Sequence, residues 1–338
     1  MTGSLLAAMT LAGTALLSPQ NKPRDEGLSR WINLQTATIS VRHRAVANDA
    51  GVWTANQLQY AGQLRARFKV DRAARLTLNA QYATGSNFTG SWNNTGIGTG
   101  EFVGTWFLKQ LFVAWAPATG VELSYGSMGP ARGAATEITT YDNDAFMPGE
   151  RITVRRPKDL FFSELTATRG FIGDLTTPSV FDRFDRLTGG RNYYQLLASK
   201  TVGSVTISGD YSRLSGVPYV RFAASVKTPA LRIVDTIRLE HYSRFGDNDA
   251  SGVGAFGERA IGSRVTMGAG YADVDPRYPA LNGDRFMRGK RIYVSASARL
   301  TRVLTAQFFG TQAIDNDFVV PAARRFDTVL VFNPFARR

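Results

Sequence analysis

Alternation of apolar and polar residues with a period of two is the feature that most constrains this chain. It is most regular over residues 58–70, where Leu, Tyr, Gly, Ala, Phe and Val alternate with a polar series that contains Arg65, Arg67 and Lys69. Successive side chains of a β-strand point to opposite faces. The segment therefore predicts a strand with one apolar face and one basic face.

The same alternation recurs in segments 76–82, 205–211, 265–271 and 292–300. In each of them the second face carries small, hydroxylic or charged residues, as on the water-facing side of a barrel lumen. Segments with the spacing of amphipathic helices are scarce. The chain is therefore predicted to be all-β. At this point a soluble sandwich, which buries its apolar face against a second sheet, remains an alternative.

The connections between the predicted strands distinguish these two folds. Short connections lie at 71–74, 117–120, 157–159, 201–204, 228–230, 262–263 and 301–303, and longer polar ones at 85–104, 128–150, 173–191, 245–251, 273–290 and 311–323. Such alternation is typical of a closed antiparallel transmembrane β-barrel with short periplasmic turns and long outer loops. Threading the chain between the connections gives about sixteen strands, an even number that requires a strand at Arg151–Arg156. The facing of two strands, near residues 32–46 and 252–261, is ambiguous.

Aromatic residues on the apolar face lie near the outer end of each predicted strand. They are Tyr60, Tyr82, Tyr125, Tyr194, Tyr211, Phe222, Tyr271, Phe308 and Phe326. Aromatic rings at one height form a belt at a membrane interface, whereas a sandwich core gives no reason for one. We therefore expect Leu64, Ala66, Leu78, Ile207 and Val294 to face lipid.

Composition excludes several functions. With no cysteine and only two histidines, disulfides, thiol catalysis and multi-histidine metal centres are not expected. The net charge of +13 fits anionic solutes, an anionic membrane surface or nucleic acid. Because the basic residues fall at lumenal or rim positions and no recognition helix is present, we expect no nucleic-acid partner. We also expect no cofactor, no metal and no enzymatic activity.

The N-terminus carries the longest uncharged segment, Leu5–Leu17, which ends at Ser18-Pro19. Its length favours a signal-peptide core over a transmembrane helix. We interpret residues 1–20 as a signal peptide or its remnant and residues 21–338 as one barrel domain. An N-terminal anchor and a buried plug helix are the alternatives.

The final predicted strand, Phe326–Phe332, alternates hydrophobic residues and ends on an aromatic before the tail Asn333–Arg338. In this respect the chain resembles the bacterial porin-like class, whose last strand has the same pattern. The resemblance extends over the chain as architecture and involves no specific motif. It implies a location in the bacterial outer membrane, passive diffusion of small hydrophilic solutes, and a homotrimer as the assembly.

The resemblance also implies a constriction of the pore. In sixteen-stranded general porins, the loop between the fifth and sixth strands folds inward, and here that loop is Met128–Glu150. Its acidic residues would be Glu137, Asp142, Asp144 and Glu150. They would face pore-lining basic residues, which we expect to be Arg65, Arg67, Lys69, Arg151, Arg155, Arg156 and Arg299. Facing charges of opposite sign order polar solutes, and rings of charge select ions. The alternative is an ordinary solvated loop.

The basic wall predicts a preference for anions, because a narrow lumen concentrates counter-ions. Arg75 lies just across the turn that follows Lys69, and further basic residues expected in the lumen are Arg221, Lys227, Arg232 and Arg238.

Three other motifs in the sequence each have a simple structural interpretation. Asp-Asn-Asp at 142–144, 247–249 and 315–317 suits turn chemistry better than a cation site. His241-Tyr242-Ser243 suits a rim histidine better than an esterase, since no orienting group or oxyanion site accompanies it. The glycine-rich run 96–100 lacks the helix of a phosphate-binding loop and is interpreted as a flexible loop.

Two other functions remain open. One is a substrate-specific channel or exporter for an anionic saccharide, the class to which alginate export porins belong. The other is a barrel whose outer loops bind a partner.

Overall fold

Alternating segments of the chain form the strands of a single closed wall. The computed structural model describes residues 30–85, 90–134, 145–173, 179–228, 233–277 and 287–335. Within these ranges sixteen antiparallel strands build the wall. They are β1 (Ile32–Ala47), β2 (Trp53–Lys69), β3 (Leu76–Thr84), β5 (Trp106–Ala118), β6 (Val121–Met128), β7 (Met147–Arg155), β8 (Glu164–Gly170), β9 (Tyr193–Val202), β10 (Val205–Leu214), β11 (Val217–Lys227), β12 (Thr236–Arg244), β13 (Ala250–Ile261), β14 (Val265–Val274), β15 (Gly289–Arg299), β16 (Leu304–Ala313) and β17 (Arg324–Phe332).

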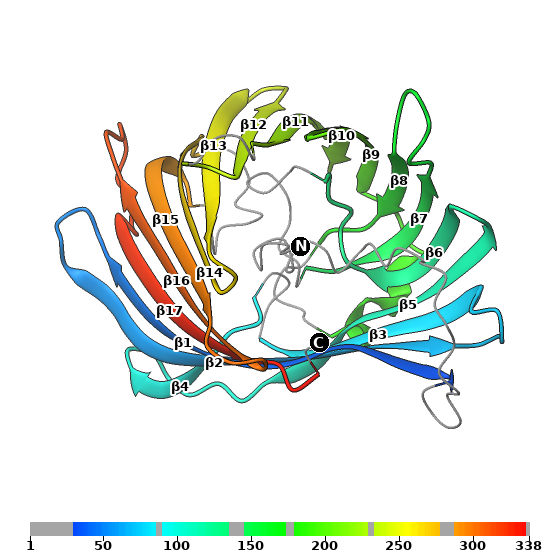
Figure 1. Cartoon of the computed structure of the whole chain (residues 1–338), viewed down its shortest axis with the longest axis horizontal. Coiled ribbons are helices and arrows are strands. Elements are labelled where there is room, and N and C mark those ends of the chain that lie inside the picture. The colour runs from blue at the N-terminus through cyan, green and yellow to red at the C-terminus, as the bar shows by residue number, and fades with distance from the viewer. Residues whose placement is uncertain are drawn as a thin grey trace.

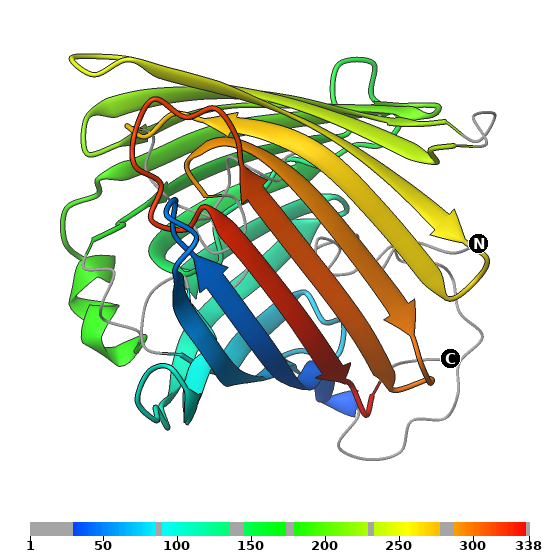
Figure 2. The same ribbon diagram turned by 90° about the vertical axis from the view of Figure 1, so that its left-hand side faces the viewer.

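Closure of the wall comes from the pairing of the first strand with the last. β1 and β17 run antiparallel, with register from Ile39 opposite Phe332 to Ala47 opposite Arg324. Figure 1 shows the resulting ring, and Figure 2 shows strands that cross the wall obliquely. The prediction of a closed barrel of about sixteen strands is confirmed, as is the strand expected at Arg151–Arg156, which is β7.

One additional strand corrects the prediction of a flexible loop at residues 96–100. β4 (Asn93–Gly98) pairs with β2 at Gln57–Tyr60, beyond the part of β2 that pairs with β3. β2 is longer than β3, so β4 covers an otherwise unpaired edge. Gly98 has a φ of +84°, and a Cβ there would lie 2.0 Å from the carbonyl oxygen of Asn56. Glycine is therefore required for this close approach.

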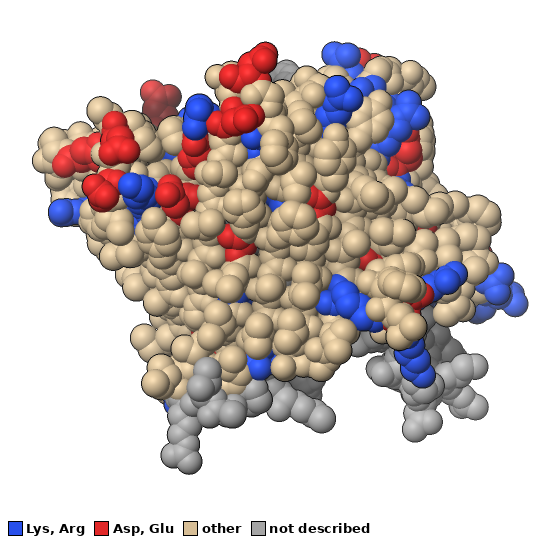
Figure 3. Space-filling model, turned by 90° about the horizontal axis from the view of Figure 1, so that it is seen from above, with Lys and Arg blue, Asp and Glu red and all other residues tan. Residues whose placement is uncertain are grey.

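The outward face of the wall is apolar and exposed. Leu64, Ile207 and Val294 are 44–54% exposed, and Ala66 and Leu78 share their face with intermediate burial. The side view in Figure 3 has a broad band with few charged side chains below the charged upper edge. An apolar band of this kind is the surface that a barrel presents to lipid.

Aromatic residues lie on this outward face toward the long-loop ends of the strands, as predicted. Seven of the nine rings are exposed, from Phe308 at 38% to Phe222 at 56%, whereas Tyr60 and Tyr271 are half-buried. Neighbouring rings pack together, as do Phe308 and Phe326 with centroids 6.4 Å apart. Among the described residues, no helix is long and apolar enough to cross a membrane.

Polar side chains fill the inner face, and one buried ion pair there gives a stability prediction. Arg221 of β11 donates from Nε to the Asp210 carboxylate of β10 at 2.7 Å, and both side chains are at most 2% exposed. Replacing Asp210 with Ala leaves a buried guanidinium without its carboxylate, which costs about 3 kcal/mol or more. We expect Asp210→Ala to lower the free energy of unfolding by that amount in denaturant titrations. The exposed Asp247→Ala serves as the control and is expected to have little effect; an equal loss in both variants would contradict the assignment.

Candidate functional site

The candidate site is the lumen, whose wall is formed by every second residue of each strand. On the described strands, basic residues hold more than twice as many lumen-facing positions as acidic ones. The basic positions are Arg42, Arg44, Arg65, Arg67, Lys69, Arg151, Arg155, Arg221, Lys227, Arg238, Arg244, Arg291, Arg299 and Arg325. The acidic positions are Glu122, Glu164, Asp210, Glu240, Glu258 and Asp327.

Arginines on β2 are held against the wall by neutral amides of the neighbouring strand β3. Arg65 donates from Nε to Gln81 Oε1 at 3.1 Å, and Arg67 donates from Nε to Asn79 Oδ1 at 3.0 Å. Each pair lies directly opposite in the strand register. An amide oxygen orients a guanidinium without cancelling its charge, so these residues contribute positive potential to the lumen.

A second arginine group lies on β1 and β17. Both oxygens of Asp327 accept hydrogen bonds from Arg44, at 2.9 and 3.0 Å, and Arg325 donates to the same carboxylate from Nε at 3.0 Å. Arg42 approaches it at 3.6 Å and stacks over the ring of Trp92, with the guanidinium carbon 4.0 Å from the centroid. Three guanidinium groups around one carboxylate make this region basic as well.

On β7–β15, several lumenal arginines have carboxylate or loop partners. Arg155 pairs with Glu164 at 3.0 Å, in addition to the Arg221–Asp210 pair. Arg151 donates from Nε to Thr168 Oγ1 at 3.1 Å and from Nη2 to the carbonyl oxygen of Gly129 at 2.5 Å. The basic potential is therefore concentrated on β17, β1 and β2.

The connection between β6 and β7 begins inside the barrel. The amide of Gln195 donates to the carbonyl oxygen of Ala131, and the backbone N–H of Ala134 donates to Ser199 Oγ, each at 3.3 Å. Gln195 and Ser199 are buried, lumen-facing residues of β9. At the other end, Gln110 donates to the carbonyl oxygen of Ala145 at 3.3 Å. These two ends of the connection therefore lie along the inner wall.

The acidic residues expected on this loop are mostly outside the described part of the chain. Glu137, Asp142 and Asp144 lie in the undescribed segment 135–144. Glu150 differs from the prediction. It belongs to β7, which begins at Met147, and it shares the outward face with Ile152 because it alternates with lumenal Arg151. Its carboxylate pairs with Arg169 and Arg191, away from the lumen.

The basic residues singled out in the sequence occupy different levels of the wall. Arg65, Arg67, Lys69, Arg151 and Arg155 lie at lumen-facing strand positions. Arg299 also lies on the lumenal side, as the exposed last residue of β15. Arg156 does not, because it is an exposed residue just after lumenal Arg155. Arg75 immediately precedes β3, and Arg232 lies outside the described residues.

The other motifs have structural surroundings that match the simpler interpretations. His241 Nε2 lies 3.1 Å from Ser243 Oγ on the outward face of β12. In the triplet 315–317, Asn316 Oδ1 accepts the backbone N–H of Lys290 at 2.7 Å, which joins this connection to the start of β15. The segment Leu5–Leu17 lies outside the described residues.

Two carboxyls outside the strands have lowered pKa values. Hydrogen bonds from Arg277, at 2.8 and 3.0 Å, lower the pKa of Asp275 in the connection after β14. The backbone N–H of Phe161, 2.8 Å away, lowers the pKa of Asp159 in the connection after β7. Both carboxylates therefore remain ionised well below neutral pH.

Functional residues that the sequence did not reveal are Arg42, Arg44, Arg325 and Asp327. A β-bulge in β1 at Gln35, between Leu34 and Thr36, interrupts the alternation and makes the facing of this strand ambiguous. After the bulge, residues 39–44 alternate regularly, and this shorter window could have placed Arg42 and Arg44 in the lumen.

Comparison with known proteins agrees with this architecture. No family model matches the chain, and no curated protein sequence matches it. Among solved structures, it is similar to a mutant of the Rhodopseudomonas blastica porin (TM-score 0.57, 12% identity, 89% of this chain and 99% of that chain covered). It is also similar to Salmonella typhi OmpF in complex with daunomycin (TM-score 0.58, 11% identity, 89% and 97% covered). The fold is therefore that of porins.

Proposed function

We propose that this protein is an outer-membrane channel for the passive diffusion of small hydrophilic solutes, with a preference for anions. The observation that carries the proposal is the excess of basic over acidic residues at lumen-facing positions, concentrated on β17, β1 and β2. A low-dielectric wall focuses this potential and raises the local concentration of anions. The apolar outward band and the porin fold support a location in the outer membrane.

The test of channel function is conductance of the purified protein in planar bilayers. We expect steady steps of current and, across a salt gradient, a reversal potential that indicates anion passage. The absence of conductance from correctly folded protein would contradict a channel, and a cation-selective reversal potential would contradict the preference for anions.

A saccharide-specific channel is the second candidate, because a cluster of aromatic rings lies on the inner face of the wall. Tyr293 lies 6.3 Å from Phe256 and 5.8 Å from Phe309 between ring centroids, and Arg325 stacks over Phe309 at 5.6 Å. Aromatic faces and arginines together suit an anionic sugar. Block of the current by an oligouronate, but not by a neutral oligosaccharide of equal length, would favour this candidate.

We also propose that the barrel assembles as a homotrimer, as the porin-like architecture suggests. Light scattering of the detergent-solubilised protein is expected to give three times the mass of one chain. The mass of a monomer would contradict this assembly.

A further inference from the structure

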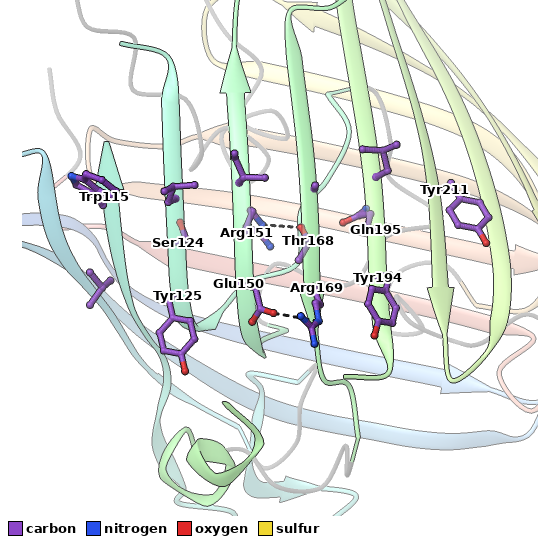
Figure 4. A pocket seen from close by; sticks show the side chains of 15 residues that line it. Trp115, Ser124, Tyr125, Glu150, Arg151, Thr168, Arg169, Tyr194, Gln195 and Tyr211 are labelled. Carbon is purple, nitrogen blue, oxygen red and sulfur yellow. Dashed lines mark hydrogen bonds and ion pairs between the residues drawn. The ribbon is translucent and has the colours of Figure 1, made fainter. Parts of the chain in front are cut away.

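A groove of about 750 Å³ runs along the outward face of the barrel across β5–β10. Figure 4 shows the side chains that line it. The exposed rings and aliphatic side chains that form its sides include Trp115, Ile152, Leu196 and Tyr211, which are 42–54% exposed. The groove lies outside the pore and is distinct from the lumenal site.

The groove is deepest where a small residue lies between larger residues of the neighbouring strands. Ala167 of β8 lies directly opposite Ile152 of β7 and Leu196 of β9 in the strand register. Leu123 of β6 continues this row on one side and Tyr211 of β10 on the other. The result is an apolar depression over Ala167, between the larger side chains of the neighbouring strands.

Two residues further toward the long-loop end, the adjacent row of outward residues contains charged side chains between tyrosines. Tyr125, Glu150, Arg169 and Tyr194 are neighbours in the strand register, and Figure 4 shows the two tyrosines on either side of the ion pair. Arg213 follows Tyr194 in the same row. Two of these residues belong to the aromatic belt, so the charges lie where lipid headgroups meet the barrel.

Arginine exceeds carboxylate in this row. The Glu150 carboxylate contacts Arg169 at 3.4 Å and Arg191 at 3.0 Å, and the Arg169 side chain is 59% exposed. Arg213 is also exposed and donates to the carbonyl oxygen of Gly216 at 2.9 Å. The exposed guanidinium groups of Arg169 and Arg213 lie with one carboxylate above the apolar groove, and the largely buried Arg191 adds a third positive charge while donating to the carbonyl oxygens of Arg186 and Leu187. Guanidinium groups recognise phosphate with paired hydrogen bonds.

We propose that the groove binds one phosphorylated lipid of the outer leaflet, with its phosphate on Arg169 and an acyl chain over Ala167. A molecule that fits this surface has an anionic head for the row of arginines and a flexible apolar tail for the groove beneath it. A second copy of the chain would bring its own excess of arginine to this row and so fits less well. The proposal requires a membrane location but not ion conduction, and lipid binding in detergent can be measured whether or not the pore conducts.

The test is native mass spectrometry of the detergent-solubilised protein titrated with bis-phosphorylated lipid A. Arg169→Gln is expected to weaken binding about tenfold, because a charge-assisted hydrogen bond contributes on the order of 1.5 kcal/mol. Ala167→Phe is expected to weaken binding by filling the groove while the cationic row is intact. Glu150→Gln is expected to strengthen binding, since two arginines lose their competing carboxylate. Arg259→Gln, an exposed outward arginine near the short-turn end of β13, is the matched control and should bind as the wild type does.

Several outcomes would overturn the proposal. One is that Arg169→Gln binds lipid A as tightly as the wild type does. Another is that the wild type binds zwitterionic phosphatidylcholine as tightly as lipid A. The third is that Glu150→Gln binds lipid A more weakly than the wild type does. A dimer of the wild type that Ala167→Phe abolishes would show that a second copy occupies the groove. Heat-modifiable gel migration verifies that each variant is folded, so loss of structure is recognised separately.

Discussion

The double variant Arg65→Glu, Arg67→Glu is expected to reverse the ion selectivity of the pore from anions toward cations. Both arginines lie on the lumenal face of β2 and are fixed by Gln81 and Asn79, so carboxylates at these positions also project from the inner wall. The substitution changes the wall by four charges within one strand. The measurement is the reversal potential across a salt gradient, for wild type and variant.

The matched control for this experiment is Arg259→Glu with Arg264→Glu. These exposed arginines lie on the outward face of β13 and in the turn that follows it, so the control has the same change in net charge outside the lumen. The control should retain the selectivity of the wild type. The effect should also weaken with salt, as the Debye length falls from about 10 Å at 0.1 M to about 3 Å at 1 M. No shift in the lumenal variant, or an equal shift in both, would remove Arg65 and Arg67 from the conduction path.

Local alternation was sufficient to predict most of the wall. Between Leu58 and Lys69 each residue's face follows from its neighbours, because a strand turns successive side chains to opposite sides. The prediction failed where the backbone departs from this rule. β4 depends on Gly98 approaching the Asn56 carbonyl, a contact between segments that no short pattern of residues encodes.

The lumenal site was only partly predictable, for two physical reasons. The first is that β7 begins at Met147, inside the segment expected to be loop, so Glu150 lies in a strand and alternation with lumenal Arg151 turns it outward. The second reason is distance along the chain. Arg44 and Asp327 are 283 residues apart and meet only because β1 pairs with β17 when the barrel closes. A contact that depends on closure has no local sequence signal.

The variant Val294→Arg is expected to destabilise the barrel strongly, because it places a charge on the face that contacts lipid. Val294 is the central residue of β15, is 48% exposed, and lies opposite Ala269 of β14 and Gly310 of β16. Its small neighbours offer no carboxylate, so an arginine there would have to enter the apolar band. Arginine on the lipid face near the bilayer midplane costs about 2–4 kcal/mol, less toward the interfaces. We therefore expect a loss of this size in the free energy of unfolding from liposomes, measured by tryptophan fluorescence in denaturant.

The matched control for Val294→Arg is Gln307→Arg, on the lumenal face of the adjacent strand β16. It introduces the same side chain into water and should change the free energy of unfolding by less than about 1 kcal/mol. Both residues lie within paired strands, so an arginine at either position meets the same kind of backbone. The difference between the two variants therefore gives the free energy of placing the arginine against lipid instead of water. Equal stability of the two variants in liposomes would mean that the face of Val294 does not contact lipid. In detergent micelles, where the arginine can reach water more easily, the difference between the variants should be smaller.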